Sequence, residues 1–221
     1  MSNAIIVNGK CYPVNVPVKL WDETGLEVVP WRGARKRRRS ITVGVWHWTG
    51  GEGGAAGLFR VLRNKGYGVE FYIDQAGTIW QFCDPALVDT FDAGWMNSRS
   101  FGVEIANYGF RRRGVLPPKR GRGRPTYLCK LNGRRREFAH FWPAQFAAAM
   151  ALADAMSNAC PVPRSVPTIG GQVVNPNTLE PEEAQHFAGH LGHFHITKRK
   201  SDPGLDLLSM FAAQFAQTIR S

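Results

Sequence analysis

The run SITVGVWHW, residues 40–48, is the stretch that most constrains what this chain can fold into. Its apolar and β-branched residues are nearly continuous rather than alternating, and the run is closed by Gly50 and Gly51. Such a run is typical of a strand buried on both faces, as in the parallel part of an α/β sheet. We therefore expect a buried strand here, with His47 near its carboxyl end.

The segments that follow alternate between strand and helix patterns. Residues 55–66 predict a helix with a C-cap at Gly66 and with Leu58, Val61 and Leu62 on one face. Further elements are predicted as a hairpin over 69–82, a strand over 100–109, an Ala-rich helix over 142–159 and a closing helix over 205–219. The closing helix has four apolar residues on one side, namely Leu208, Phe211, Phe215 and Ile219. This alternation predicts an α/β domain in which a central mixed sheet is flanked by helices.

The length of 221 residues suits one domain with additions. Residues 1–39 predict an N-terminal extended or hairpin arm, with an Asn-Gly turn in IIVNGKCYPV, and a basic linker at 32–39. Residues 40–221 then form the main domain, interrupted by a basic surface insertion at about 110–137. We expect this chain to act as a monomer.

The charge of the chain is +11 and is unevenly distributed. Residues 111–136 contain eleven of the 28 lysines and arginines and no acidic residue. Such a surface is attracted to a polyanion, which for this chain is nucleic acid, an anionic lipid surface or a cell-wall polymer. No nucleic-acid-binding motif is recognisable, so we expect no specific nucleic-acid partner.

Targeting and redox signals are weak. There is no apolar stretch of about 18 residues and no signal peptide at the start, so we expect no transmembrane segment and synthesis in the cytoplasm. The four cysteines are scattered without CxxC spacing, which favours free thiols over a disulfide framework.

Three features carry candidate chemistry. Glu104 lies within an apolar strand, where burying a carboxylate costs free energy unless it has a functional role or faces solvent. His47 ends a buried strand, where it is either a metal ligand or a histidine without a functional role at the edge of the core. The stretch GHLGHFHITKRKSDPG, residues 189–204, adds three histidines and Asp202. Two histidines and a carboxylate make a common catalytic zinc set, although histidines beside lysines also suit a solvated surface or a nucleic-acid patch.

Read in order, these segments resemble a known family. The matching pieces are VGVWHWTGG, VEFYIDQAGTIWQF, DAGWMNSRSFGVEIANYG, WPAQFAAAMALADAM, VPRSVPT and GHFHITKRKSDPG. Together they resemble the zinc-dependent N-acetylmuramoyl-L-alanine amidases of the type-2 amidase and peptidoglycan-recognition superfamily, over residues 40–210. The resemblance implies a zinc hydrolase that cuts the amide bond between N-acetylmuramic acid and L-alanine of peptidoglycan.

The resemblance also implies roles for particular residues. Zinc would be held by His47, His193 and Asp202, with His190 as the reserve candidate for His193. Glu104 would be the catalytic base and Lys200 would assist, since the branch that uses a tyrosine instead has it where this chain has Val69. His195 falls at a non-ligand position.

One departure concerns the family's His-Ala-Gly motif, which here reads Asp92-Ala93-Gly94. The histidine of that motif is expected to contact substrate, so the departure bears on subsite recognition.

The resemblance implies peptidoglycan or muropeptides as substrate and a bacteriolytic, endolysin-like role at the cell wall. Phage release, muropeptide recycling and secretion remain open. The basic insertion would bind an anionic cell-wall or outer-membrane surface, as a steering device or as an antimicrobial, membrane-disturbing arm. A peptidoglycan-binding relative without catalysis and a nucleic-acid-binding protein are the rival interpretations.

Overall fold

A mixed six-stranded sheet forms the centre of the computed structural model, which describes residues 3–30, 33–110, 123–174, 179 and 181–218. Its strands, in spatial order, are β14 (Gly189–Gly192), β5 (Val43–Trp48), β9 (Ser100–Ile105), β6 (Phe71–Ile73), β7 (Ile79–Gln81) and β3 (Val18–Lys19). The first four are parallel neighbours, and β7 returns antiparallel to β6. The predicted α/β fold with a mixed sheet is confirmed.

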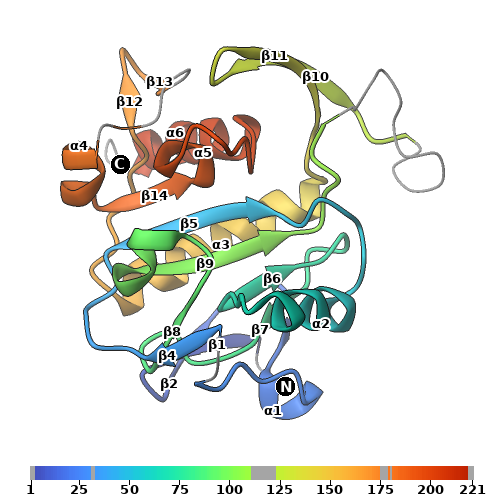
Figure 1. The fold of residues 1–221 in the computed structure, drawn as a ribbon, viewed down its shortest axis with the longest axis vertical. Coiled ribbons are helices and arrows are strands. Elements are labelled where there is room, and N and C mark those ends of the chain that lie inside the picture. Colours follow the sequence, from blue (N-terminus) through green and yellow to red (C-terminus); the bar gives the residue numbers. More distant parts are fainter. Residues whose placement is uncertain (1–2, 31–32, 111–122, 175–178, 180, 219–221) are drawn as a thin grey trace.

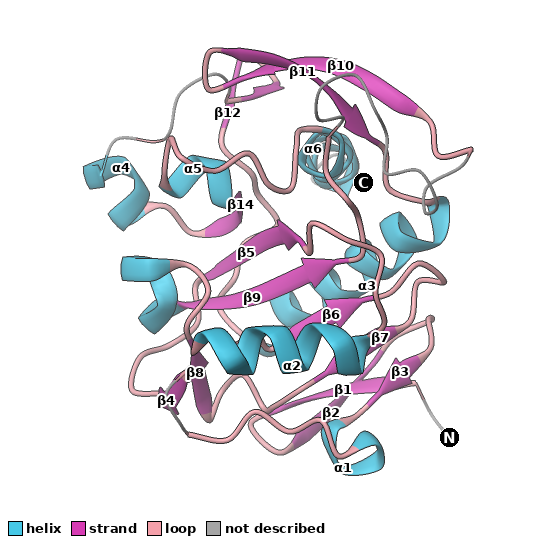
Figure 2. Cartoon of the chain, turned by 45° about the vertical axis from the view of Figure 1, so that its right-hand side comes forward, coloured by secondary structure: helices cyan, strands magenta, loops and turns pink. Residues whose placement is uncertain are grey.

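Helices cover both faces of this sheet (Figures 1 and 2). On one face, α3 (Pro143–Ala159) and α6 (Asp206–Thr218) pack on the main hydrophobic core, to which β5 contributes Trp46. On the other face, α2 (Ala55–Lys65) lies over a smaller cluster that includes Tyr72 of β6. Successive residues of a strand point to opposite faces, so β5 places Trp46 in the main core and Val43 and Val45 in a third cluster with Met96 and Leu191. Burial on both faces is why its sequence is continuously apolar.

The helices follow the sequence signals with one exception. Pro143 is the first residue of α3, and Gly66 ends α2 in the left-handed conformation with φ of 72°. Val61, predicted on the buried face of α2, is instead 50% exposed. The partly buried positions of this helix are Leu58, Phe59 and Leu62, so Phe59 supplies the packing that we had assigned to Val61. In α6, Leu208, Phe211 and Phe215 are buried as predicted, and Ile219 lies outside the described residues.

The N-terminal hairpin is present as β1 (Ala4–Val7) and β2 (Lys10–Pro13). Its turn is Asn8-Gly9, both with positive φ, as a two-residue hairpin turn requires. Ile5 and Val7 are buried in the main core, so this arm packs on the domain rather than standing away from it. The chain continues through β3 and a short helix α1 (Trp21–Thr24).

The basic linker at 32–39 is only partly a surface segment. It contains β4 (Ala34–Lys36), which pairs with β8 (Val88–Thr90). Arg37 is buried and forms an ion pair of 2.8 Å with Glu70, which is also fully buried. The guanidinium of Arg37 donates as well to the backbone oxygen of Ser100 at 2.7 Å, which ties this linker to the first residue of β9. The predicted linker is therefore not a surface segment throughout, because Arg37 packs inside the domain.

The basic insertion at 110–137 forms a hairpin over its second half. The strands are β10 (Thr126–Leu131) and β11 (Arg134–Ala139), joined by Asn132-Gly133 with positive φ at both residues. The hairpin lies across the top of the molecule in Figure 1. It is anchored where the hydroxyl of Tyr127 accepts a hydrogen bond of 3.0 Å from the backbone nitrogen of Leu205. Residues 111–122 of the insertion lie outside the described residues.

The remaining elements are short. They are the 3-10 helix η1 (Gly94–Arg99), β12 (Thr168–Ile169), β13 (Gln172–Val173), α4 (Pro181–His186) and α5 (His193–Ile196). Cys11, Cys83, Cys129 and Cys160 are all free, as predicted. Within the described ranges, no helix combines the length and the apolar character needed to cross a bilayer.

Candidate metal centre

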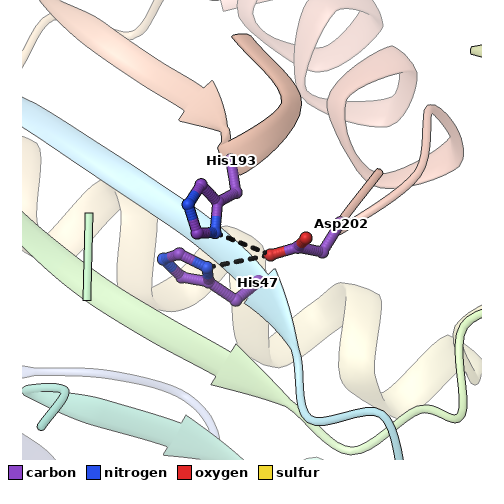
Figure 3. A group of neighbouring side chains, drawn as sticks. All are labelled: His47, His193 and Asp202. Atoms are coloured by element: carbon purple, nitrogen blue, oxygen red, sulfur yellow. Dashed lines mark hydrogen bonds and ion pairs between the residues drawn. The ribbon is translucent and has the colours of Figure 1, made fainter. Parts of the chain in front are cut away.

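Three side chains that are distant in sequence converge at the carboxyl end of β5 (Figure 3). His47 is the penultimate residue of β5, and His193 opens α5 directly after β14. Because β14 and β5 are parallel neighbours, both chain segments bring their histidine to the same edge of the sheet. Asp202 comes from the loop before α6, where its peptide bond to Pro203 is cis.

The geometry of this cluster is tight. Nδ1 of His47 and Nδ1 of His193 each lie 3.0 Å from Oδ2 of Asp202. The two rings meet edge to face, with centroids 4.6 Å apart and an interplanar angle of 80°. All three residues are buried, with exposed fractions of 3%, 8% and 8%. The sequence-predicted ligand residues are thus brought together by the fold.

The charges of the cluster are set by these contacts. Burial alone would lower the pKa of His47, but the hydrogen bonds with Asp202 and Asp92 outweigh it and raise this pKa to about 10. Burial and the positive charge of His47 lower the pKa of His193. Burial would raise the pKa of Asp202, yet the hydrogen bonds from both rings hold it well below its usual value. Without a metal, positive charge is therefore favoured on His47 rather than on His193, and negative charge is favoured on Asp202.

This donor set fits Zn²⁺. Two imidazole nitrogens and a carboxylate oxygen are the ligand types of catalytic zinc sites that keep a fourth position open. Zinc–ligand bonds of about 2.1 Å in tetrahedral geometry set ligand atoms about 3.4 Å apart. The observed separations of 3.0 Å need only a small adjustment to meet that spacing. Across the described part of the chain, no other group of three such residues comes as close together.

Glu104 lies next to the cluster because it is the register partner of His47 between β9 and β5. Paired residues of neighbouring strands share a face of the sheet, so both side chains project to the same side. Oε2 of Glu104 is buried and finds no hydrogen-bond partner among the described residues. Burial raises the pKa of Glu104 to about 7, although the charge of His47 acts in the opposite direction.

Lys200 is exposed and lies in the loop that leads to Asp202. Its backbone is fixed at both ends, because its nitrogen donates to Thr197 O at 3.1 Å and its oxygen accepts from Asn132 Nδ2 at 3.0 Å. Its positive charge is felt at Glu104 and at His193, where it acts to lower both pKa values. Val69, at the position where the resemblance implies a tyrosine in the other branch of the family, is buried.

The other two histidines of the 189–204 stretch lie elsewhere. His190 pairs with Gly44 across β14 and β5, which places it on the face opposite to His47. There its Nδ1 accepts a hydrogen bond of 3.2 Å from Trp46 Nε1, and burial lowers its pKa to about 3. His195 uses Nδ1 to accept from Gly192 N at 3.1 Å, and its Nε2 contacts the backbone oxygen of Val174 at 3.1 Å. His190, the reserve ligand, therefore cannot reach the cluster.

Sequence reasoning missed one contact of the cluster. Oδ2 of Asp92 lies 3.1 Å from Nε2 of His47, on the side of the ring away from Asp202. The sequence identifies Asp92 only as the residue in place of a histidine that the resemblance expects to contact substrate. The replacement could have indicated this contact, because a buried aspartate needs a hydrogen-bond donor as its partner.

Comparison with known families agrees with this description. Residues 37–205 match the family model described as N-acetylmuramoyl-L-alanine amidase. The match covers well over half of the chain, so the protein belongs to this family. The resemblance drawn from the sequence is thereby confirmed at the level of the family. A comparison with curated proteins gave no match.

Solved structures of similar fold include three amidases or endolysins. The endolysin N-acetylmuramoyl-L-alanine amidase LysCS from Clostridium intestinale URNW is 15% identical, with a TM-score of 0.52 over 92% of this chain and 98% of that one. The Ph2119 endolysin from the Thermus scotoductus MAT2119 bacteriophage is 15% identical, with a TM-score of 0.51 over 90% and 98%. LysC from Clostridium intestinale URNW is 14% identical, with a TM-score of 0.50 over 89% and 96%. At these identities the likeness establishes the fold.

Proposed function

We propose that this protein is a zinc-dependent peptidoglycan hydrolase that cleaves the amide bond between the lactyl group of N-acetylmuramic acid and L-alanine. The observation that carries the proposal is the meeting of His47, His193 and Asp202 beside Glu104. Membership of the N-acetylmuramoyl-L-alanine amidase family supports the bond and the substrate. Peptidoglycan, or a muropeptide derived from it, is the proposed substrate.

In this proposal, His47, His193 and Asp202 would hold Zn²⁺, which would supply Lewis-acid chemistry toward the scissile carbonyl and toward water. Glu104 takes the proton from the attacking water and returns it to the nitrogen of L-alanine as the C–N bond breaks. A pKa of about 7 suits both transfers, because such a carboxyl exchanges protons readily near neutral pH. Its Oε2, which has no partner among the described residues, is available for this bond.

Lys200 is proposed to stabilise the negative charge that develops on the carbonyl oxygen during attack. A cation placed at developing charge lowers the barrier more than it stabilises the bound substrate. The influence of Lys200 on the pKa values of Glu104 and His193 supports its placement near the reacting atoms. Its exposed side chain can approach a substrate without a cost of burial in the free protein.

The test is mass spectrometry of fragments released from defined peptidoglycan, with and without a chelator. The proposal predicts stem peptides with a free L-alanine amino terminus, no new reducing sugar ends, loss of release with chelator and recovery with Zn²⁺. Release of other fragments would contradict the assigned bond. Zinc near one per chain with no hydrolysis would point instead to a peptidoglycan-binding relative.

The exposed cations beside the site suit a cell-wall role. Asn132, at the tip of the β10–β11 hairpin, donates to the backbone oxygen of Lys200, so hairpin and loop lie side by side. Exposed cations of the two segments are Lys130, Arg134, Arg135, Lys198, Arg199 and Lys200. We propose that this basic surface attracts anionic cell-wall or outer-membrane polymers and raises the encounter rate. An endolysin-like role, in which the protein made in the cytoplasm acts on the wall, follows from this surface and from the proposed reaction.

A further inference from the structure

The imidazole of His47 is held between two aspartates. Oδ2 of Asp202 faces its Nδ1 at 3.0 Å, and Oδ2 of Asp92 faces its Nε2 at 3.1 Å. The two ring nitrogens point in diverging directions, so Asp92 lies on the side of the ring away from the proposed metal position. Its side chain is buried, with 6% exposed. Asp92 therefore contacts a proposed ligand without being placed to act as one.

The position of the Asp92 carboxylate depends on a glycine in the sheet. A Cβ atom at Gly102 of β9 would lie 2.0 Å from Oδ2 of Asp92, so only a glycine at this position leaves room for the carboxylate. The turn that carries Asp92 is fixed from its other side. Oδ1 of Asn97 accepts hydrogen bonds from the backbone nitrogens of Asp92 at 3.3 Å and Ala93 at 2.7 Å. Two separate features of the chain thus position this one carboxylate.

We infer that Asp92 is a positioning residue for the zinc ligand His47, an inference that rests on the proposed zinc site. An ionised carboxylate only accepts hydrogen bonds, so its contact with Nε2 keeps the ring proton on that nitrogen. Nδ1, which faces Asp202, would then be the ring nitrogen that serves as the metal ligand. A carboxylate behind a ligating histidine fixes its tautomer and orientation and raises its basicity, and its loss typically costs 10–100-fold in metal affinity.

This role differs from that expected of the histidine found at this position in other family members. Asp92 is turned toward His47, with the ring edge as its partner, rather than toward open space. An aspartate in place of a histidine thus places a negative charge directly behind the proposed metal position. A fixed negative charge there favours a divalent cation in the site.

The experiment compares the zinc affinity of the full-length wild-type protein with that of Asp92→Ala and Asp92→Asn, by competition with a chromophoric chelator. We expect a loss of about 10–100-fold for Asp92→Ala. Asp92→Asn, which keeps an oxygen acceptor of the same size, should recover part of that loss and guards against misfolding of the alanine variant. Asp89→Ala is the matched control, because Asp89 is also buried but pairs with Arg35 instead of His47. The zinc affinity of Asp89→Ala should equal that of the wild type.

A second readout reports the tautomer directly. In the zinc-loaded wild type, ¹⁵N NMR of the His47 ring should show a protonated Nε2 in slow exchange with solvent, and Asp92→Ala should show faster exchange of that proton. Equal zinc affinity and equal exchange in wild type and Asp92→Ala would overturn the positioning role alone. A wild type that binds no zinc would overturn the proposed zinc site, and this inference with it.

Discussion

His190 and His193 each follow a glycine and stand three residues apart, yet the fold gives them opposite environments. His190 lies within β14, on the face shared with Gly44 and Trp46, among the aromatic rings of Phe211 and Phe215. His193 comes just after β14 ends and meets His47 and Asp202 at the edge of the sheet. The difference follows from strand geometry. His190 lies inside β14, where side chains alternate between the two faces of the sheet, whereas His193 comes after the last residue of the strand and lies at the edge of the sheet.

The two faces of the sheet show the same division on a larger scale. One face carries Trp46, Phe101 and His190 and is closed by α3 and α6. The other carries His47 and Glu104 at the carboxyl ends of β5 and β9. Ligands of open α/β sheets bind at the carboxyl ends of parallel strands, and here the candidate site lies at such an end. The comparison predicts that substitutions on the face with Trp46 and His190 mainly lower stability, whereas substitutions on the face with His47 and Glu104 mainly affect metal binding and activity.

The largest effect is expected from substituting the two histidines one at a time. His193→Ala removes a proposed ligand and should take zinc content from about one per chain to near zero. His190→Phe removes a core histidine whose Nε2 is buried without a partner among the described residues, and leaves Trp46 Nε1 without its acceptor. We expect it to keep zinc and to lose about 1–3 kcal/mol of stability. Metal analysis and thermal unfolding measure the two outcomes, and a reversal of the zinc results would break the comparison.

Zinc affinity should depend strongly on pH. The metal-free pKa of His47 is about 10, so at neutral pH the ring carries a proton that zinc must displace. The apparent affinity should therefore rise about tenfold per pH unit between pH 6 and 9, with about one proton released per ion bound. Calorimetry in buffers of different ionisation enthalpy measures that proton. A flat profile would mean that His47 is neutral before binding.

A smaller effect is expected from the basic hairpin. Arg134→Ala with Arg135→Ala should lower the rate on whole cell walls by a few-fold at low salt, since exposed charges mainly affect encounter. The rate on small soluble muropeptides should stay the same. The matched control is Arg60→Ala on α2, an exposed arginine away from the hairpin. An equal loss on both substrates would place these arginines in substrate binding rather than in steering.

The sequence was informative where a signal is local. The strand at 40–48, the helix that starts at Pro143 and the turn at Asn8-Gly9 were predicted from short patterns. The β10–β11 hairpin was missed because its Asn132-Gly133 turn is embedded in a basic run that was interpreted only as charge. That turn is flanked by strand-compatible residues, so the pattern was available.

Contacts between distant segments were beyond the reach of pattern alone. Nothing near Arg37 in the sequence reveals that it would be buried against Glu70, because this partner is 33 residues away, just before β6. The bond between Asp92 and His47 likewise joins residues 45 positions apart. Only the spatial order of the strands, and the missing side chain at Gly102, make room for it. The proposed ligands themselves came from a family resemblance, which the fold then brought to one place.

The central claim is that Glu104 performs the proton transfers beside a metal held by its neighbours. The most direct test measures zinc content and turnover of Glu104→Gln in the same preparation, on purified peptidoglycan. The variant keeps the size of the side chain and removes its ability to take a proton. We predict zinc near one per chain and a loss of turnover of about 10²–10⁴-fold. Turnover near that of the wild type, with zinc bound, would contradict the assignment of Glu104.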